Sequence, residues 1–80
     1  MITSSQLKAA RAMTGLTVRE LAEQSNIAFS TLVRLESAGN EVPAGNIETF
    51  KKLMKAFEQA GIEFIGTPDD RPGVRLNLPR

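Results

Sequence analysis

The chain has 80 residues, 41% of them hydrophobic, and its ten basic and nine acidic residues leave a formal charge of +1. That length allows one small domain, and the shortage of aromatic residues favours a core of many aliphatic contacts between helices. The absence of cysteine and histidine excludes disulfides and thiolate metal sites and removes the commonest general base, so we expect no enzyme, no cofactor and no metal.

No apolar run is long enough to suggest a membrane span, and residues 1–12 lack the apolar centre of a secretory signal. We therefore expect a cytoplasmic protein that acts neither at a membrane nor on a small-molecule substrate. A nucleic-acid-binding protein usually carries more positive charge than this chain does. The distribution of charge therefore matters more than its sum.

The first expected helix covers residues 4–14. Thr3 and Gln6 can form a capping box, in which the hydroxyl accepts from an amide of the first turn while the glutamine side chain returns a bond to the capping residue. Gly15 follows at the point where such a helix would end.

Two further short helices are expected close together. A second capping box, from Thr17 to Glu20, opens a helix that ends near Gln24. Residues 25–27 form a turn, because asparagine at the centre tolerates a left-handed backbone. The next helix is expected over 28–37.

The sequence after residue 37 predicts one more helix and a hairpin. After a loop over 39–45, Asn46 can cap a helix that ends at Gly61. The period then changes to alternation, which predicts strands at 62–65 and 74–78 around a turn-rich segment. The apolar stripe of this last helix is Ile47, Phe50, Leu53, Met54 and Phe57.

The helix over 28–37 carries side chains that its own core does not require. At about 100° per residue, Ala28, Leu32 and Leu35 share the inward stripe. Two helices joined by three or four residues, the second standing out from the domain, form the helix-turn-helix arrangement, whose second helix can enter the DNA major groove. The outward or flanking residues are Phe29, Ser30, Thr31, Val33, Arg34 and Ser37.

The segment from Leu16 to Glu36 resembles the XRE, or phage-repressor/Cro, family, whose pattern runs roughly L-T-x-x-E-L-A-x-x-[SA]-G-[VI]-S-x-x-T-[IL]-x-x-[ILW]-E. The resemblance covers about residues 3–60, and the ending AGIEFI…PGVRL is similar to that of many short bacterial members. It implies a mainly α, four-helix repressor/Cro-like helix-turn-helix domain over 1–61 with a short C-terminal β-hairpin over 62–80. The matching residues are Leu16, Thr17, Glu20, Leu21, Ala22, Ile27, Thr31, Leu32, Leu35 and Glu36.

The resemblance implies a DNA-binding site of two kinds of residue. Base reading is expected from Phe29, Ser30 and Arg34, since arginine can bind guanine O6 and N7 in a bidentate pair. Arg34 would otherwise be solvated or paired with a carboxylate. Phe29 would otherwise cover the junction of the two helices or anchor a protein partner. Contacts to the DNA backbone are expected from Thr17, Arg19, Thr31, Ser37 and Asn40.

Some other residues are expected to have structural roles, and some depart from the XRE family pattern. Arg11 takes the place of a family arginine that pairs with the glutamate at Glu36, which implies an ion pair that fixes orientation. Ala28 replaces the usual capping serine, a loss of ~1 kcal/mol. Val18 and Glu41 weaken the expected phosphate contacts. The basic cluster Lys51, Lys52 and Lys55 favours a solubilising outer face over a DNA contact.

Two functions from different classes follow. The first is a sequence-specific transcriptional regulator of bacterial or phage origin, associated with the nucleoid, that binds double-stranded DNA as a homodimer. An isolated hairpin is marginal and an exposed apolar strand invites pairing, so we expect the dimer interface at Ile62, Phe64, Val74, Leu76 and Leu78. The alternative is a protein-interaction module of the same fold, such as an antitoxin or anti-activator, that masks a partner.

Overall fold

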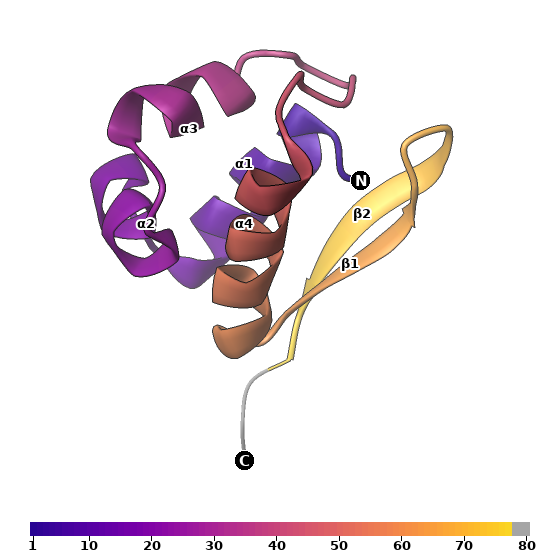
Figure 1. Cartoon of the computed structure of the whole chain (residues 1–80). Helices are drawn as coiled ribbons and strands as arrows, with labels where there is room; N and C mark the ends of the chain where they lie inside the picture. The colour runs from indigo at the N-terminus through magenta and orange to yellow at the C-terminus, as the bar shows by residue number, and fades with distance from the viewer. Residues whose placement is uncertain (78–80) are drawn as a thin grey trace.

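The computed structural model describes residues 1–77 (Figure 1). The expected coarse architecture, a mainly helical chain with a C-terminal antiparallel hairpin, is confirmed in this range. Leu78, predicted to belong to the second strand and to a dimer interface, lies outside the described residues. The elements are α1 (Ser4–Thr14), α2 (Val18–Ser25), α3 (Phe29–Leu35), α4 (Ile47–Gln59), β1 (Ile62–Thr67) and β2 (Asp70–Leu76).

Helix α1 has the predicted bounds and the predicted cap. The Thr3 hydroxyl accepts from the Gln6 amide at 3.0 Å, and the Thr3 amide donates to Gln6 Oε1 at 2.9 Å. Gly15 adopts a left-handed backbone, with φ of 73°, directly after the helix. Both signals are local, which explains why the sequence predicts this helix correctly.

Helix α3 is shorter than the predicted 28–37. Ala28 stands at the N-cap and has no side chain that can accept a hydrogen bond. At the other end the Ser4 hydroxyl donates to the Leu35 carbonyl and accepts from the Ala38 amide at 3.0 Å. The helix therefore ends at Leu35, because a side chain of α1 takes the carbonyl that another turn would need.

The hairpin strands are longer than predicted, and the segment expected to be a turn is mostly paired. Thr67 pairs with Asp70, and the register shifts between Ile65 and Thr67. Gly66, with φ of 73°, occupies this irregularity, where an added Cβ would lie 2.2 Å from the Arg71 carbonyl oxygen. Both strands are edges, so the turn-forming residues of 66–73 can pair there.

The hairpin packs against the helices of its own chain, beside α1 and α4 (Figure 1). Ile62 is 6% exposed within the core, and the Phe64 ring meets the fully buried Phe57 ring edge-on at 5.7 Å between centroids. Val74 and Leu76 are half-buried against the same core. The apolar side of the hairpin is thus partly covered by its own chain, with Ile62 buried and the other three side chains half-buried. The dimer interface expected at these residues stays a prediction.

Gln6 links α1 to both strands. Its side chain is buried, and Nε2 donates to the Ile65 carbonyl at 3.3 Å and the Gly73 carbonyl at 3.0 Å. These two residues are partners across the sheet. One amide therefore caps α1 and positions the hairpin beside it.

We expect Gln6→Ala to lower the free energy of unfolding by about 2–3 kcal/mol, because the Thr3 amide and the two strand carbonyls lose their partner. Urea denaturation measures the change. Gln24→Ala, the same truncation at an exposed position of α2, is the control and should change stability little. Equal stability of the two variants would contradict the role given to Gln6.

Candidate nucleic-acid interface

Helices α2 and α3 form a firmly connected pair. Asn26 adopts the predicted left-handed conformation, with φ of 57°, and its amide donates to carbonyls at the end of α2. Leu21 and Leu32 are fully buried between the pair and the rest of the core. Residues 26–28 are the whole connection, so α3 has a fixed orientation relative to α2.

The outer surface of α3 is exposed as the helical spacing predicts. Ser30 and Arg34 are exposed, and Thr31 is half-buried. Phe29 and Val33, one turn apart, keep 43% and 45% of their surface exposed. Val33 was not among the predicted site residues, although its helical position alone places it on this face.

Arg34 is held by the loop that follows α3. Its Nη1 donates to the Ala44 carbonyl at 2.5 Å. This differs from both ordinary possibilities, a free solvated side chain and a pairing with a carboxylate. The acceptor is a backbone carbonyl ten residues away in sequence, which no sequence pattern indicates.

Phe29 and Arg19 lie together. The guanidinium carbon of Arg19 is 4.8 Å from the centroid of the Phe29 ring, a cation–π contact of about 0.5–1 kcal/mol at an exposed site. Phe29 thus bridges α2 and α3, as one alternative held, while keeping much of its surface in solvent. The contact also fixes a positive charge beside α3.

Three predicted DNA-backbone residues already use their polar groups within the chain. The Thr17 hydroxyl accepts from the Glu20 amide, and the Thr17 amide donates to the Glu20 carboxylate, both at 3.0 Å. Ser37 Oγ donates to the Val33 carbonyl at 2.7 Å, and Asn40 Oδ1 accepts from Ser5 Oγ at 2.7 Å. Donation to a phosphate from the Thr17 amide or the Ser37 hydroxyl requires a change of partner, whereas the Thr17 hydroxyl only accepts within the chain and keeps its proton for a phosphate.

The predicted pair of Arg11 and Glu36 is present. Arg11 Nε and Nη2 donate to the two carboxylate oxygens at 2.8 and 3.0 Å, and Nη1 donates to the Leu16 carbonyl at 3.2 Å. Glu36 is 7% exposed. The hydrogen bonds to Glu36 raise the pKa of Arg11 above its ordinary value, against an opposing effect of burial. A raised pKa in the folded chain means that Arg11 contributes its full share of the pair's stabilisation below its ordinary pKa and loses that share as the pH rises through the raised one.

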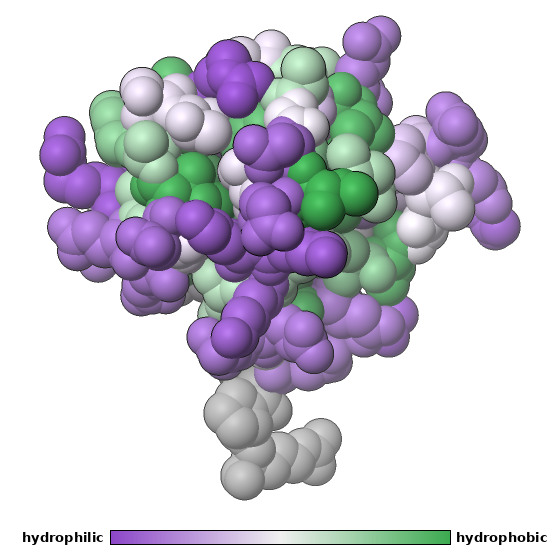
Figure 2. Space-filling model, viewed as in Figure 1, coloured by the Kyte–Doolittle hydropathy of each residue, from purple (hydrophilic) through white to green (hydrophobic). Residues whose placement is uncertain are grey.

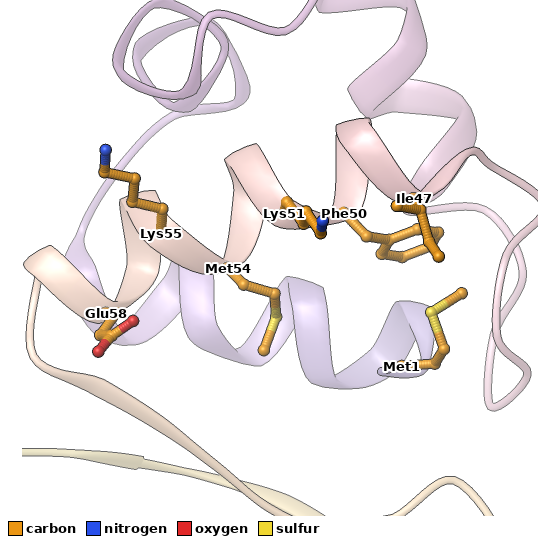
Figure 3. Close-up of a pocket in the computed structure, with 7 residues that line it drawn as sticks. All are labelled: Met1, Ile47, Phe50, Lys51, Met54, Lys55 and Glu58. Carbon is orange, nitrogen blue, oxygen red and sulfur yellow. The ribbon is translucent and has the colours of Figure 1, made fainter.

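A groove beside α4 was not predicted. Ile47 was expected to face the core but is 65% exposed, because it lies at the first helical position, beyond the buried stripe. The groove has a volume of about 320 Å³ and opens between α4 and the start of the chain (Figure 3). We call it the α4 groove; its lining includes Met1, Ile47, Lys51, Met54, Lys55 and Glu58.

The basic cluster of α4 is exposed as expected, but its three lysines face two ways. Lys51 and Lys55 line the α4 groove, whereas Lys52 and Lys55 line a second hollow with Asn26 at the end of α2. Across residues 1–77, no cluster of three or more acidic side chains is placed to hold a metal ion. In the same range no helix is long and apolar enough to cross a membrane.

No protein-family model matches this chain, and no curated protein matches it either. The likeness to XRE regulators thus depends on the residues from Leu16 to Glu36 and remains a prediction.

Removing Glu36 should leave the partly buried Arg11 without its carboxylate. We expect Glu36→Ala to cost about 3 kcal/mol of unfolding free energy, measured by urea denaturation. Glu23→Ala, at an exposed position of α2, provides the control. A loss no larger than that of the control would show that the pair does not hold the helices.

Glu20 should contribute to acid sensitivity. Its hydrogen bonds from Thr17 lower its pKa below the ordinary 4.5. A lowered pKa in the folded chain means that the stabilisation is present above the ordinary value and is lost as the pH falls through the lowered one.

Glu20→Gln keeps the capping geometry without a titrating group. We expect its urea midpoint to fall less than that of the parent chain between neutral pH and about pH 3. Glu23→Gln makes the same charge change later in α2 and should leave the parent's dependence intact. Parallel pH profiles for the parent and Glu20→Gln would contradict this role of the cap.

Proposed function

We propose that the protein is a sequence-specific transcriptional regulator of the XRE, repressor/Cro-like class, which binds double-stranded DNA with α3 in the major groove. The observation that carries the proposal is the exposed surface of α3. It is a mixed polar and aromatic surface, held at a fixed orientation by α2 and the Arg11–Glu36 pair. A rigid second helix of this kind is what major-groove reading requires.

Arg34 is the principal reader in this proposal. It is exposed, and one neutral carbonyl of the loop holds it. Exchanging that bond for a bidentate pair with guanine O6 and N7 yields two hydrogen bonds in place of one. Ser30 and Phe29 would contact neighbouring base edges, the ring against a thymine methyl group.

The DNA backbone contacts are proposed for Arg19, Thr17, Thr31, Ser37 and Asn40. Arg19 has the strongest support, because its charge lies over the Phe29 ring beside α3. Thr17 has the weakest support, because the Glu20 carboxylate already binds its amide and would repel a phosphate.

The regulator would act as a homodimer on a two-fold operator, with reading helices about 34 Å apart. Repression by blocking polymerase is the simplest outcome, and activation through a surface patch is equally compatible. Such a protein would be found in the cytoplasm with the nucleoid, and it would need neither cofactor nor small-molecule substrate.

One observation favours the alternative, a module that masks a protein partner. Phe29 and Val33 form an exposed apolar pair on α3, and the net charge is only +1. Apolar interfaces depend weakly on salt, whereas binding by phosphate neutralisation weakens steeply as salt rises.

We expect Arg34→Ala to weaken binding to the best genomic fragment about 5- to 150-fold, the equivalent of the 1–3 kcal/mol of a good bidentate pair. Fragments selected from genomic DNA are titrated at several salt concentrations to measure this. Arg75→Ala removes a similar exposed side chain on β2 and should retain full affinity.

The two functions give opposite results in that titration. Salt-sensitive, Arg34-dependent binding to a palindromic site supports the regulator. Absence of enrichment over random DNA at low salt would reject it and favour a protein partner at Phe29 and Val33.

A further inference from the structure

The exposed side of α4 carries a row of side chains that the core does not use. Ile47 is 65% exposed and Met1 66% exposed, with half-buried Met54 between them and the hairpin. In Figure 3 the labelled side chains of Met1, Ile47 and Met54 reach toward the α4 groove, and Figure 2 shows hydrophobic surface (green) beside hydrophilic surface (purple) on this face.

Two of the three charges on this row, Lys51 and Glu58, are placed symmetrically about Met54, and the third, Lys55, lies next to the midpoint. Lys51 and Glu58 both line the α4 groove and are separated by seven residues, which is close to two helical turns, or about 10.5 Å along the axis. Their midpoint falls beside Met54. Within residues 1–77 neither of them forms an ion pair in its own chain.

For two copies in register about Met54, the Lys51–Glu58 spacing is complementary when the helices are antiparallel, and the two Lys55 side chains then lie near the axis, where each extends toward solvent. If a second α4 runs in the opposite direction across Met54, each Lys51 lies opposite a Glu58 of the other helix. A parallel partner in register would instead place like charges together. A two-fold axis generates the antiparallel arrangement and uses the same surface on both copies.

The apolar residues fit the same register. A different hollow, separate from the one beside Asn26, has a volume of about 370 Å³ and continues from Met54 and Glu58 toward Ile62 and Phe64. Antiparallel pairing about Met54 brings Ile47 of one copy to the end of α4 in the other, where this hollow lies. Ile47, an exposed large apolar side chain of the helix, thereby gains an apolar contact.

The arrangement also suits two reading helices. In Figure 1, α2 and α3 lie on one side of α4 and the hairpin on the other. A two-fold axis that runs perpendicular to α4, from the hairpin side toward the α2–α3 side, reverses the direction of α4 in the second copy. The same rotation leaves both copies of α3 on one side of the dimer. A two-fold operator requires this geometry.

We propose that the chain forms a two-fold homodimer through antiparallel pairing of α4, with reciprocal Lys51–Glu58 ion pairs around Met54 and Ile47 in the hollow beside Phe64. This inference specifies the partner surface of the regulator proposed above and rests on that function only for its biological purpose. It shifts the centre of the interface from the hairpin, expected from the sequence, to α4, and keeps only Ile62 and Phe64 of the expected residues, at the edge of the contact.

Charge reversal tests the register directly. In sedimentation velocity over a wide concentration range without DNA, the parent chain should be a dimer at high concentration. Lys51→Glu and Glu58→Lys should each weaken the dimer about tenfold or more, since each turns two attractive pairs into two repulsive ones. The double variant Lys51→Glu/Glu58→Lys should recover dimerisation by restoring opposite charges in both pairs.

Lys52→Glu is the matched control, because it makes the same charge change on α4 outside the groove. It should dimerise like the parent. Thermal unfolding followed by circular dichroism checks that the exposed substitutions leave every variant folded. A parent chain that stays monomeric, single variants that dimerise normally, or a double variant that stays monomeric would each overturn the proposed pairing.

The same proteins separate this inference from the proposed function. A charge-dependent dimer that never enriches DNA would keep the α4 interface and reject the regulator. Salt-sensitive operator binding by a chain whose association ignores Lys51 and Glu58 would keep the regulator and reject the interface.

Discussion

The buried first turn of α1 is the constraint on which the other elements depend. Thr3, Ser4 and Gln6 are polar residues enclosed by the fold, and each is engaged in hydrogen bonds. A buried polar group without a partner would cost more than most single contacts provide. The chain after α3 and both strands must therefore meet this turn at fixed positions, and no buried side-chain polar atom within residues 1–77 lacks a partner.

The exposed surface of α3 inherits its rigidity from these contacts. Ser4 ends the helix by engaging the Leu35 carbonyl, and Arg11 holds Glu36 immediately afterwards. A reading surface needs such support, because small errors in orientation forfeit base contacts. These contacts do not involve the Arg34 side chain, which instead donates to the Ala44 carbonyl in the loop after α3.

Local signals explain what the sequence predicted well. Capping boxes at Thr3 and Thr17 and the left-handed Asn26 act within a few residues, so the bounds of α1 and the α2–α3 turn followed from pattern alone. The features that the sequence did not predict depend on residues far away in the chain. Ser4 shortened α3, and the helical core enclosed Ile62. The groove beside Ile47 also escaped prediction, since periodicity places that side chain inward while its terminal position exposes it.

The bonds of Gln6 also set an order of events during synthesis. Gly73 lies 67 residues after Gln6, so the start of α1 leaves the ribosome long before its last acceptors exist. Until then the buried turn can satisfy its own cap but not its contacts to the hairpin. The nascent domain therefore completes its fold only after β2 has been synthesised, because a shorter product lacks the Gly73 carbonyl that Gln6 binds.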